Sequence, residues 1–138
     1  MSDDASADQP NQPDQRPGRI GWQDLTVDNA EVARDFYSEV VGWQTMPLDM
    51  GGYDDYVMLS PDGPNGVVGV AGVCHARGIN ANIPPQWLVY INVENLDESV
   101  KSALALGGEV VDGPREMGEG RFAVIRDPAG AVCGLIQA

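Results

Sequence analysis

The sequence repeats one set of landmarks at a fixed separation of 66 residues. The pairs that share this separation are Leu25 and Ile91, Val27 and Val93, Asn29 and Asn95, and Gly42 and Gly108. In each half they mark the same order: a β-like run, an Asn, a helical run that a Gly ends, and three more β-like runs. One such unit has a single helix and an open sheet, so it cannot cover its own apolar face, whereas two packed units can. The repeat therefore predicts a duplicated α+β fold, in which two βαβββ units form a curved mixed sheet around a concave cavity.

Local signals place the boundaries of these elements. In the first unit they predict a strand at Ile20–Val27, a helix capped by Asp28 or Asn29 and ended by Gly42, and strands at Trp43–Leu48, Tyr53–Leu59 and Gly66–Cys74. In the second unit they predict a strand at Trp87–Val93, a helix capped by Asn95 and ended by Gly107-Gly108, and strands at Glu109–Asp112, Arg121–Arg126 and Ala131–Ile136. We expect turns at Gly113-Pro114 and at residues 127–130 between the last three strands.

Apolar residues recur with the helical period in both predicted helices. They are Val32, Ala33, Phe36, Tyr37, Val40 and Val41 in the first helix, and Leu96, Val100, Ala103, Leu104 and Leu106 in the second. We expect each set to line one face of its helix.

The chain divides into a tail and one domain. Residues 1–18 contain Asp, Gln, Pro and Ser with no large apolar residue after Met1, so we expect a disordered acidic tail. Residues 19–138 form a single domain, because 138 residues leave no room for two cores. Within it we predict a first unit at 19–74, a linker at 75–86 and a second unit at 87–138.

Charge narrows the possible partners. The chain carries 21 acidic and 8 basic residues, a formal net charge of −13, and its basic residues do not cluster. Such a surface repels phosphate backbones and anionic membranes, so neither nucleic acid nor a membrane is an expected partner. The sequence also lacks a secretory leader and a membrane-spanning apolar run, so we expect a cytoplasmic protein in which Cys74 and Cys133 remain free thiols.

Several short motifs resemble those of a known superfamily. They are Asn29–Tyr37 followed by Val41-Gly42-Trp43, Val93–Asp97, Leu106-Gly107-Gly108, Gly120-Arg121 and Asp127–Gly130. In order and spacing they resemble the vicinal oxygen chelate superfamily, the glyoxalase, bleomycin resistance and dioxygenase group, over residues 19–138. The resemblance implies the fold described above and a homodimer. It leaves the activity open, because the superfamily contains lyases, dioxygenases, isomerases, thiol transferases and metal-free drug binders.

The resemblance also implies where a metal would be held. Enzymes of this superfamily usually bind one divalent ion with four side chains, one from the first and one from the last strand of each unit. These positions fall on Trp22 and Leu88, and on Gly134 and either Gly69 or Val70. None of these side chains can ligate a metal.

An alignment shifted by one residue does not restore a ligand set. It brings in Gln23, but it leaves Val89 and either Cys133 or Leu135 at the other positions. The single histidine, His75, starts the linker, where a structural or solvated role is expected. We therefore expect no metal and no other cofactor, although Asp24 could act as a displaced ligand.

Strand alternation predicts the residues that face the cavity. Leu25 and Val27 should face the first helix, which leaves Trp22, Asp24 and Thr26 on the concave side. By the same reasoning Leu88, Tyr90 and Asn92 face the cavity in the second unit, and Tyr56 and Met58 join them from the third strand. The predicted ligand-binding residues are Trp22, Asp24, Tyr56, Met58, Leu88, Tyr90 and Asn92.

These residues allow three functional hypotheses. The first is a metal-free binder of a small apolar or aromatic molecule, on which Trp22 and Tyr90 stack. The second is a metal-dependent lyase or dioxygenase with displaced ligands such as Asp24 and Gln23. The alternative for Trp22 and Tyr90 is that they simply fill the core between the sheets. The third hypothesis is a module that acts only by pairing with another protein. No catalytic residue is assigned, because a nucleophilic site would need a usable histidine.

Overall fold

A computed structural model describes residues 15–138 and contains two helices and eight strands within that range. The first unit contains β1 (Ile20–Val27), α2 (Ala30–Val41), β2 (Gln44–Asp49), β3 (Asp54–Pro61) and β4 (Val67–His75). The second unit contains β5 (Trp87–Asn92), α3 (Leu96–Ala105), β6 (Glu109–Met117), β7 (Gly120–Arg126) and β8 (Val132–Gln137). A short 3₁₀ helix, η1 (Gly78–Asn80), lies between the units. The predicted fold of two βαβββ units is confirmed.

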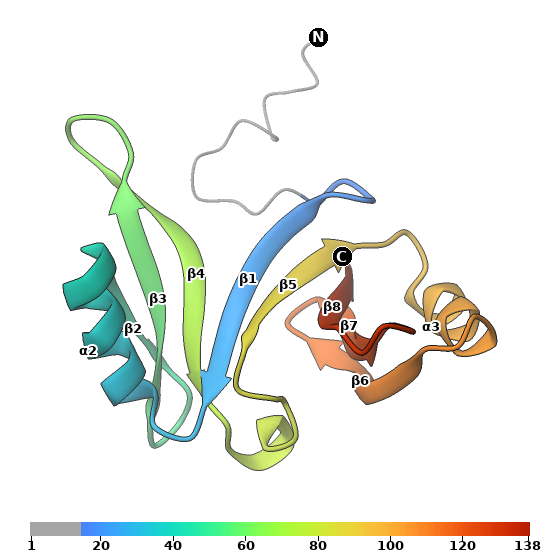
Figure 1. Ribbon diagram of the computed structural model, residues 1–138. Helices are drawn as coiled ribbons and strands as arrows, with labels where there is room; N and C mark the ends of the chain where they lie inside the picture. The colour runs from blue at the N-terminus through green and yellow to red at the C-terminus, as the bar shows by residue number, and fades with distance from the viewer. Residues whose placement is uncertain (1–14) are drawn as a thin grey trace, which may run out of the picture.

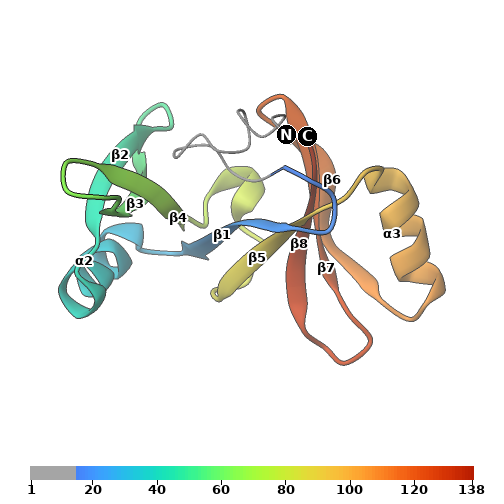
Figure 2. The ribbon, with the colours of Figure 1, turned by 90° about the horizontal axis from the view of Figure 1, so that it is seen from above.

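All eight strands form one mixed sheet in the order β2-β3-β4-β1-β5-β8-β7-β6. The units join through the antiparallel pair β1 and β5, in which Gln23 lies opposite Val89. These two residues are 66 positions apart, so the local two-fold axis that relates the units passes between them. Figure 1 shows β1 and β5 at the centre, and Figure 2 shows β2–β4 and β6–β8 on either side of them.

Each helix begins at an asparagine cap: Asn95 was predicted for α3, and Asn29 is one of the two candidates that the sequence left open for α2. The side chain of Asn29 accepts a hydrogen bond from the Val32 amide, and that of Asn95 accepts one from the Glu98 amide. Such caps satisfy backbone donors that the first helical turn leaves free. Gly42 then ends α2 in the left-handed conformation, with φ of 88°.

The two helices cover the outer face of the sheet, one over each unit (Figure 1). Beneath α2 lies a core of Ala30, Tyr56, Met58, Ala71 and Val73, against which Tyr37, Trp43 and Trp87 pack. Beneath α3 lies a smaller core of Leu96, Ala123 and Leu135. Neither helix of residues 15–138 has the length and apolar composition that a membrane span requires.

Only part of each helical apolar set packs against the sheet. Ala33 and Tyr37 pack against the core of the first unit, whereas Val32, Phe36 and Val40 are 63%, 56% and 63% exposed. In α3 the same holds at the C-terminal end, where Leu104 and Leu106 are exposed. The expectation of one buried apolar face was too broad, because in α2 the apolar residues cover more of the helix than the sheet can contact.

Most predicted strand boundaries differ from the observed ones by one or two residues, and the end of β6 differs most. Gly113-Pro114 was expected to end a strand, but β6 continues through it to Met117, with register shifts on both sides. β6 is an edge strand, where a proline interrupts no ladder on its free side. The tail was expected to be disordered through residue 18, whereas the Gly18 amide donates to the carbonyl of Asn92. Residues 1–14 of that predicted tail lie outside the described residues.

Candidate ligand-binding cleft

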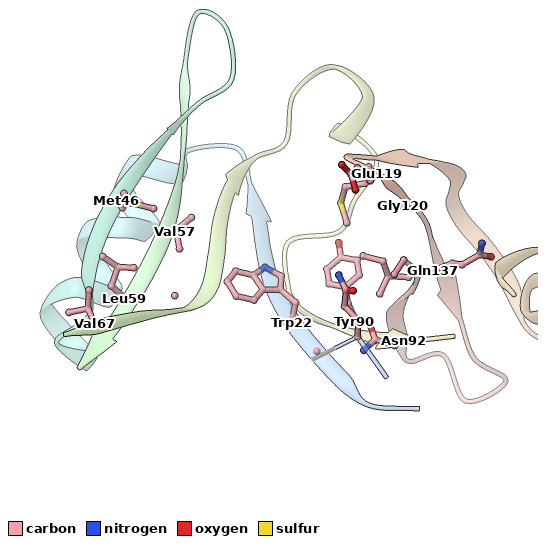
Figure 3. Close-up of a pocket in the computed structure, with 16 residues that line it drawn as sticks. Trp22, Met46, Val57, Leu59, Val67, Tyr90, Asn92, Glu119, Gly120 and Gln137 are labelled. Carbon is pink, nitrogen blue, oxygen red and sulfur yellow. The ribbon is translucent and has the colours of Figure 1, made fainter. Parts of the chain in front are cut away.

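The concave face of the sheet contains an open cleft of about 870 Å³. This volume is within the range of small-molecule pockets. The residues that line it are Gln15, Gly21, Trp22, Met46, Val57, Leu59, Val67, Gly69, Tyr90, Asn92, Met117, Glu119, Gly120, Ile136, Gln137 and Ala138. Figure 3 shows Trp22 between an apolar wall from β2–β4 and Tyr90 on β5.

The first unit forms the apolar wall of the cleft. Met46 on β2, Val57 and Leu59 on β3, and Val67 on β4 point their side chains toward the same space (Figure 3). Gly69 adds no side chain, so Val57 can lie close to the β4 backbone, with the Trp22 indole beside it. This wall offers contact surface without hydrogen-bond demands, as apolar ligands require.

The corresponding part of the second unit is filled by its own side chains. Ile83, from the segment after η1, packs with Leu88, Tyr90, Phe122 and Val124 in one buried cluster. The cleft therefore spans both units, with Asn92, Met117 and Ile136 among its lining residues from the second, and this cluster fills only part of that unit's concave face.

Arg115 adds to the filled part of the concave face in the second unit. Its guanidinium lies 4.4 Å from the Phe122 ring centroid, and it forms a 2.7 Å ion pair with Asp112. It also donates a 2.7 Å hydrogen bond to Asn80 of η1. These contacts hold the segment between the units against β6 and β7.

Four side chains form the floor of the cleft around the local two-fold axis. Trp22 lies opposite Tyr90 in the β1–β5 register, and Asp24 lies opposite Leu88. The axis therefore relates Trp22 to Leu88 and Asp24 to Tyr90. The indole N–H of Trp22 donates a 2.6 Å hydrogen bond to the Asp24 carboxylate, which fixes the orientation of the ring.

Two glycines make room for the floor residues. Asp24 pairs with Gly72 of β4, and Tyr90 pairs with Gly134 of β8 in the equivalent position. A Cβ atom at Gly72 would overlap the Asp24 carboxylate, and one at Gly134 would overlap the Tyr90 ring. A side chain at Gly72 is therefore incompatible with Asp24 in its observed position, and a side chain at Gly134 is incompatible with Tyr90.

Asp24 is the floor residue whose altered pKa lies nearest to neutral pH. Burial raises its pKa to about 6, the Trp22 hydrogen bond opposes this rise, and the negative charge of Asp55 adds to it. Burial also raises the pKa values of Tyr90 and Cys74, and the Asp24 charge contributes to both increases. At neutral pH the floor therefore presents an ionised carboxylate beside a neutral phenol and a neutral thiol.

The residues at the four expected metal-ligand positions do not fit a divalent ion. Trp22 and Leu88 stand at the expected positions on the first strands, and Gly134 and either Gly69 or Val70 stand at those on the last strands. Among residues 15–138, no three His, Cys, Asp or Glu side chains gather as a metal site would require. His75 is buried against Tyr53 on the helix-facing side of β4, away from the cleft.

The structure brings most, but not all, of the predicted site residues together. Trp22, Tyr90 and Asn92 line the cleft, and Asp24 lies beside Trp22 on the same face. Leu88 also lies on that face, but it is 1% exposed beneath the cluster that contains Ile83. It closes the floor and does not line the open cleft.

The placement of Tyr56 and Met58 was wrong, and Gln23, considered as a displaced ligand, points away from the cleft. Tyr56 and Met58 are buried in the core beneath α2, on the face opposite the cleft. Gln23 alternates with Trp22 and Asp24, so its side chain leaves the cleft, and its amide donates to the Val70 carbonyl. Gln23 and Asp24 therefore cannot share a metal in the cleft.

The cleft residues of β3 escaped prediction because that strand is apolar on both faces. Val57 and Leu59 line the cleft, one position away from the predicted pair. Val57 pairs with Gly72 as Val124 pairs with Gly134, so the separation between units has changed from 66 to 67 residues at this strand. Each glycine marks where a large neighbour lies on the cleft face, but this pairing is known only from the structure.

This combination of two βαβββ units and a concave cleft defines a recognisable class of protein. Methylmalonyl-CoA epimerase of Streptomyces coelicolor, solved with 2-nitronate-propionyl-CoA, superposes with a TM-score of 0.53 at 14% identity. The match covers 89% of this chain and 99% of that one. At this identity the likeness shows a shared fold.

Sequence comparison supplies the family. The model of the Glyoxalase-like domain matches residues 24–136, and the chain belongs to this family of the vicinal oxygen chelate superfamily. It is 33% identical over 121 residues to the anthracycline biosynthesis protein DnrV of Streptomyces peucetius, covering 88% of this chain and 42% of that protein. It is 30% identical over 121 residues to the putative glyoxylase CFP32 of Mycobacterium bovis, covering 87% and 44%. The chain thus spans less than half the length of these curated relatives.

Proposed function

We propose that this protein binds a small planar aromatic molecule in the concave cleft and does so without a metal ion. The observation that carries the proposal is the floor, where Trp22 stands at a position expected for a metal donor and Tyr90 lies opposite it. Glycines on β4 and β8 make space for Asp24 and Tyr90. Flat aromatic surfaces beside an apolar wall favour stacking of a flat ligand. The names of DnrV and of the Streptomyces protein DauV, both from anthracycline biosynthesis, support a fused-ring ligand.

Binding of an anthraquinone tests this proposal. We expect 1,8-dihydroxyanthraquinone to quench the tryptophan fluorescence of the protein, because Trp22 lines the cleft. Trp22→Ala should weaken the binding by about 1–3 kcal/mol, the scale of one aromatic stacking surface. Fluorescence titration and calorimetry measure both effects.

The other two tryptophans provide the control. Trp43 and Trp87 pack together with Tyr37 beneath α2, so Trp87→Phe should leave the anthraquinone affinity unchanged. Undiminished affinity in Trp22→Ala, together with a large loss of thermal stability, would instead make Trp22 a core residue. Elemental analysis completes the test: near-stoichiometric Zn, Ni, Fe or Mn after dialysis of native protein would contradict metal-free binding.

We further propose that the protein acts in the cytoplasm as a homodimer. The dimer is supported by its resemblance to small two-unit members of the superfamily and by the frequency of two-fold dimers among soluble proteins. The net charge of −13 supports a small-molecule ligand over nucleic acid.

A further inference from the structure

The cleft carries negative charge without a basic residue to balance it. Of the residues that line the open cleft in the described part of the chain, Glu119 is charged and none is Lys, Arg or His. Asp24 adds a second carboxylate at the floor, beside Trp22. A ligand held here therefore meets aromatic and apolar surface together with carboxylate oxygens.

Asp24 lies where the open cleft meets the closed part of the concave face. Toward one end of β1 the neighbouring Trp22 lines the cleft, and toward the other end Thr26 is buried. Asp24 itself is only partly buried. Because β1 is flanked by β4 and β5, the side chain of Asp24 reaches solvent only through the concave face.

The groups around Asp24 do not neutralise it. Asp55 on β3, Cys74 on β4 and Tyr90 on β5 face it, and of these Asp55 brings further negative charge. Trp22 and the Gly72 amide supply neutral donors. The cation on the same face, Arg115, is engaged with Asp112, Asn80 and the Phe122 ring. A cationic group on a ligand would therefore stabilise this partly buried carboxylate, which has no cation from residues 15–138 beside it to do so.

We propose that Asp24 binds the protonated amine of an aromatic ligand whose ring system stacks on Trp22. This inference rests on the proposed binding function. It specifies the ligand class as a planar aromatic ring system that carries a protonated alkylamine. Trp22 and Tyr90 add to the preference, because the faces of aromatic rings attract cations. The net charge of −13 raises the local concentration of such ligands before they bind.

Three anthracene probes with one ring system and different charges test the proposal. They are 9-(methylaminomethyl)anthracene as the cation, 9-anthracenemethanol as the neutral compound and 9-anthracenecarboxylate as the anion. At pH 7.5 the wild-type protein should bind the cation at least about tenfold more tightly than the alcohol, a difference of 1.4 kcal/mol. In Asp24→Asn, which retains an oxygen for the Trp22 hydrogen bond, this preference should fall to about twofold, with the alcohol affinity unchanged.

Glu119→Gln is the matched control, because Glu119 is the other carboxylate at the cleft. It should retain the preference for the cation, and so should wild-type protein in 0.5 M NaCl, since a buried pair is screened less than the overall surface charge. Asp24→Ser serves as a second variant if Asp24→Asn does not fold, as judged by circular dichroism.

The outcomes separate this inference from the proposed function. Equal binding of the three probes would overturn the amine site and leave the aromatic cleft standing. A preference that persists in Asp24→Asn, or that disappears in Glu119→Gln or in high salt, would also overturn it. Failure of all three probes to bind wild-type protein at millimolar concentration would overturn the proposed function and this inference with it.

Discussion

The acidity of Asp24 makes the stability of the fold depend on pH. Its folded-state pKa of about 6 lies above the ordinary value of 3.8, so between these values the folded chain binds a proton that the unfolded chain has released. Stability from this group is therefore full below about pH 4 and is lost as the pH rises through 6. The loss is about 2–3 kcal/mol.

Asp24→Asn should remove this dependence. We expect the variant to be more stable than the wild type at pH 7.5, and to lose the difference at pH 4, where the wild-type carboxyl is protonated. Urea denaturation at a series of pH values measures both. A variant that is less stable than the wild type at pH 7.5 would show that the carboxylate is stabilised in the folded state, contrary to our assignment.

Gly134 offers a second prediction at the scale of single residues. In Gly134→Ala the new methyl group would overlap the Tyr90 ring, which is buried and cannot move without disturbing Phe122. We expect a loss of about 1–3 kcal/mol in unfolding free energy, as in other overpacked sites, and weaker binding in the cleft. Gly66→Ala, at an exposed turn with ordinary space for a methyl group, is the control and should change neither quantity.

Cleft residues could be predicted only on strands whose sequence shows which face is buried. In β1 the helix-facing residues Leu25 and Val27 share their spacing with Ile91 and Val93, so the face of Trp22 was determined twice. In β3 both faces are apolar and the spacing between units shifts, so nothing in the sequence fixed which of Tyr56 and Val57 faced the cleft. A register error of one residue reverses every side chain of a strand.

At the scale of elements, the two helix caps can be compared directly because they occupy equivalent positions. Asn29→Ala and Asn95→Ala each remove a side-chain acceptor for a first-turn amide, at 3.2 and 3.1 Å respectively. Each should lower the unfolding free energy by about 1 kcal/mol. The effects should add in the double variant, since the helices pack on different units. A combined loss well below the sum, measured by thermal and urea denaturation, would contradict independent caps.

The ends of helices and strands were predictable where a short sequence pattern has the same structural effect wherever it lies in the fold. Asn caps and the left-handed Gly42 act within one turn of chain, so both helix starts and the end of α2 were placed correctly. Gly113-Pro114 was misread because its effect depends on whether the strand is central or at an edge. Strand position in the sheet is a property of the whole fold, and no local pattern near residue 113 reports it.

At the scale of the whole molecule, the two ends of the sheet and the outer surface of α2 bear on the predicted homodimer. The edge strands β2 and β6 contain Pro47 and Pro114, which lack the N–H that pairing with another strand needs. The exposed apolar residues Val32, Phe36 and Val40 repeat every four positions along α2. We therefore expect a second copy to pack against α2 and not to extend the sheet.

Sedimentation measures this prediction. The wild-type chain should sediment as a dimer at micromolar concentration, and Phe36→Asp should shift it toward monomer while leaving the thermal stability of the monomer intact. Leu106→Asp, at an exposed apolar position beyond α3, is the control and should remain dimeric. A wild-type monomer throughout the micromolar range would contradict the dimer, and a dimeric Phe36→Asp protein would contradict this interface.

The filled part of the second unit's concave face affects the direction in which a ligand binds. An unbroken two-fold axis would offer two equivalent half-sites, so that one molecule could bind in either of two opposite directions. Ile83 and Arg115 fill part of the concave face in the second unit, whereas Val57 and Leu59 of the first unit line the open cleft. The duplicated scaffold thus presents a surface with a head and a tail. It can distinguish the two ends of an unsymmetrical molecule and hold a single molecule per chain in one direction.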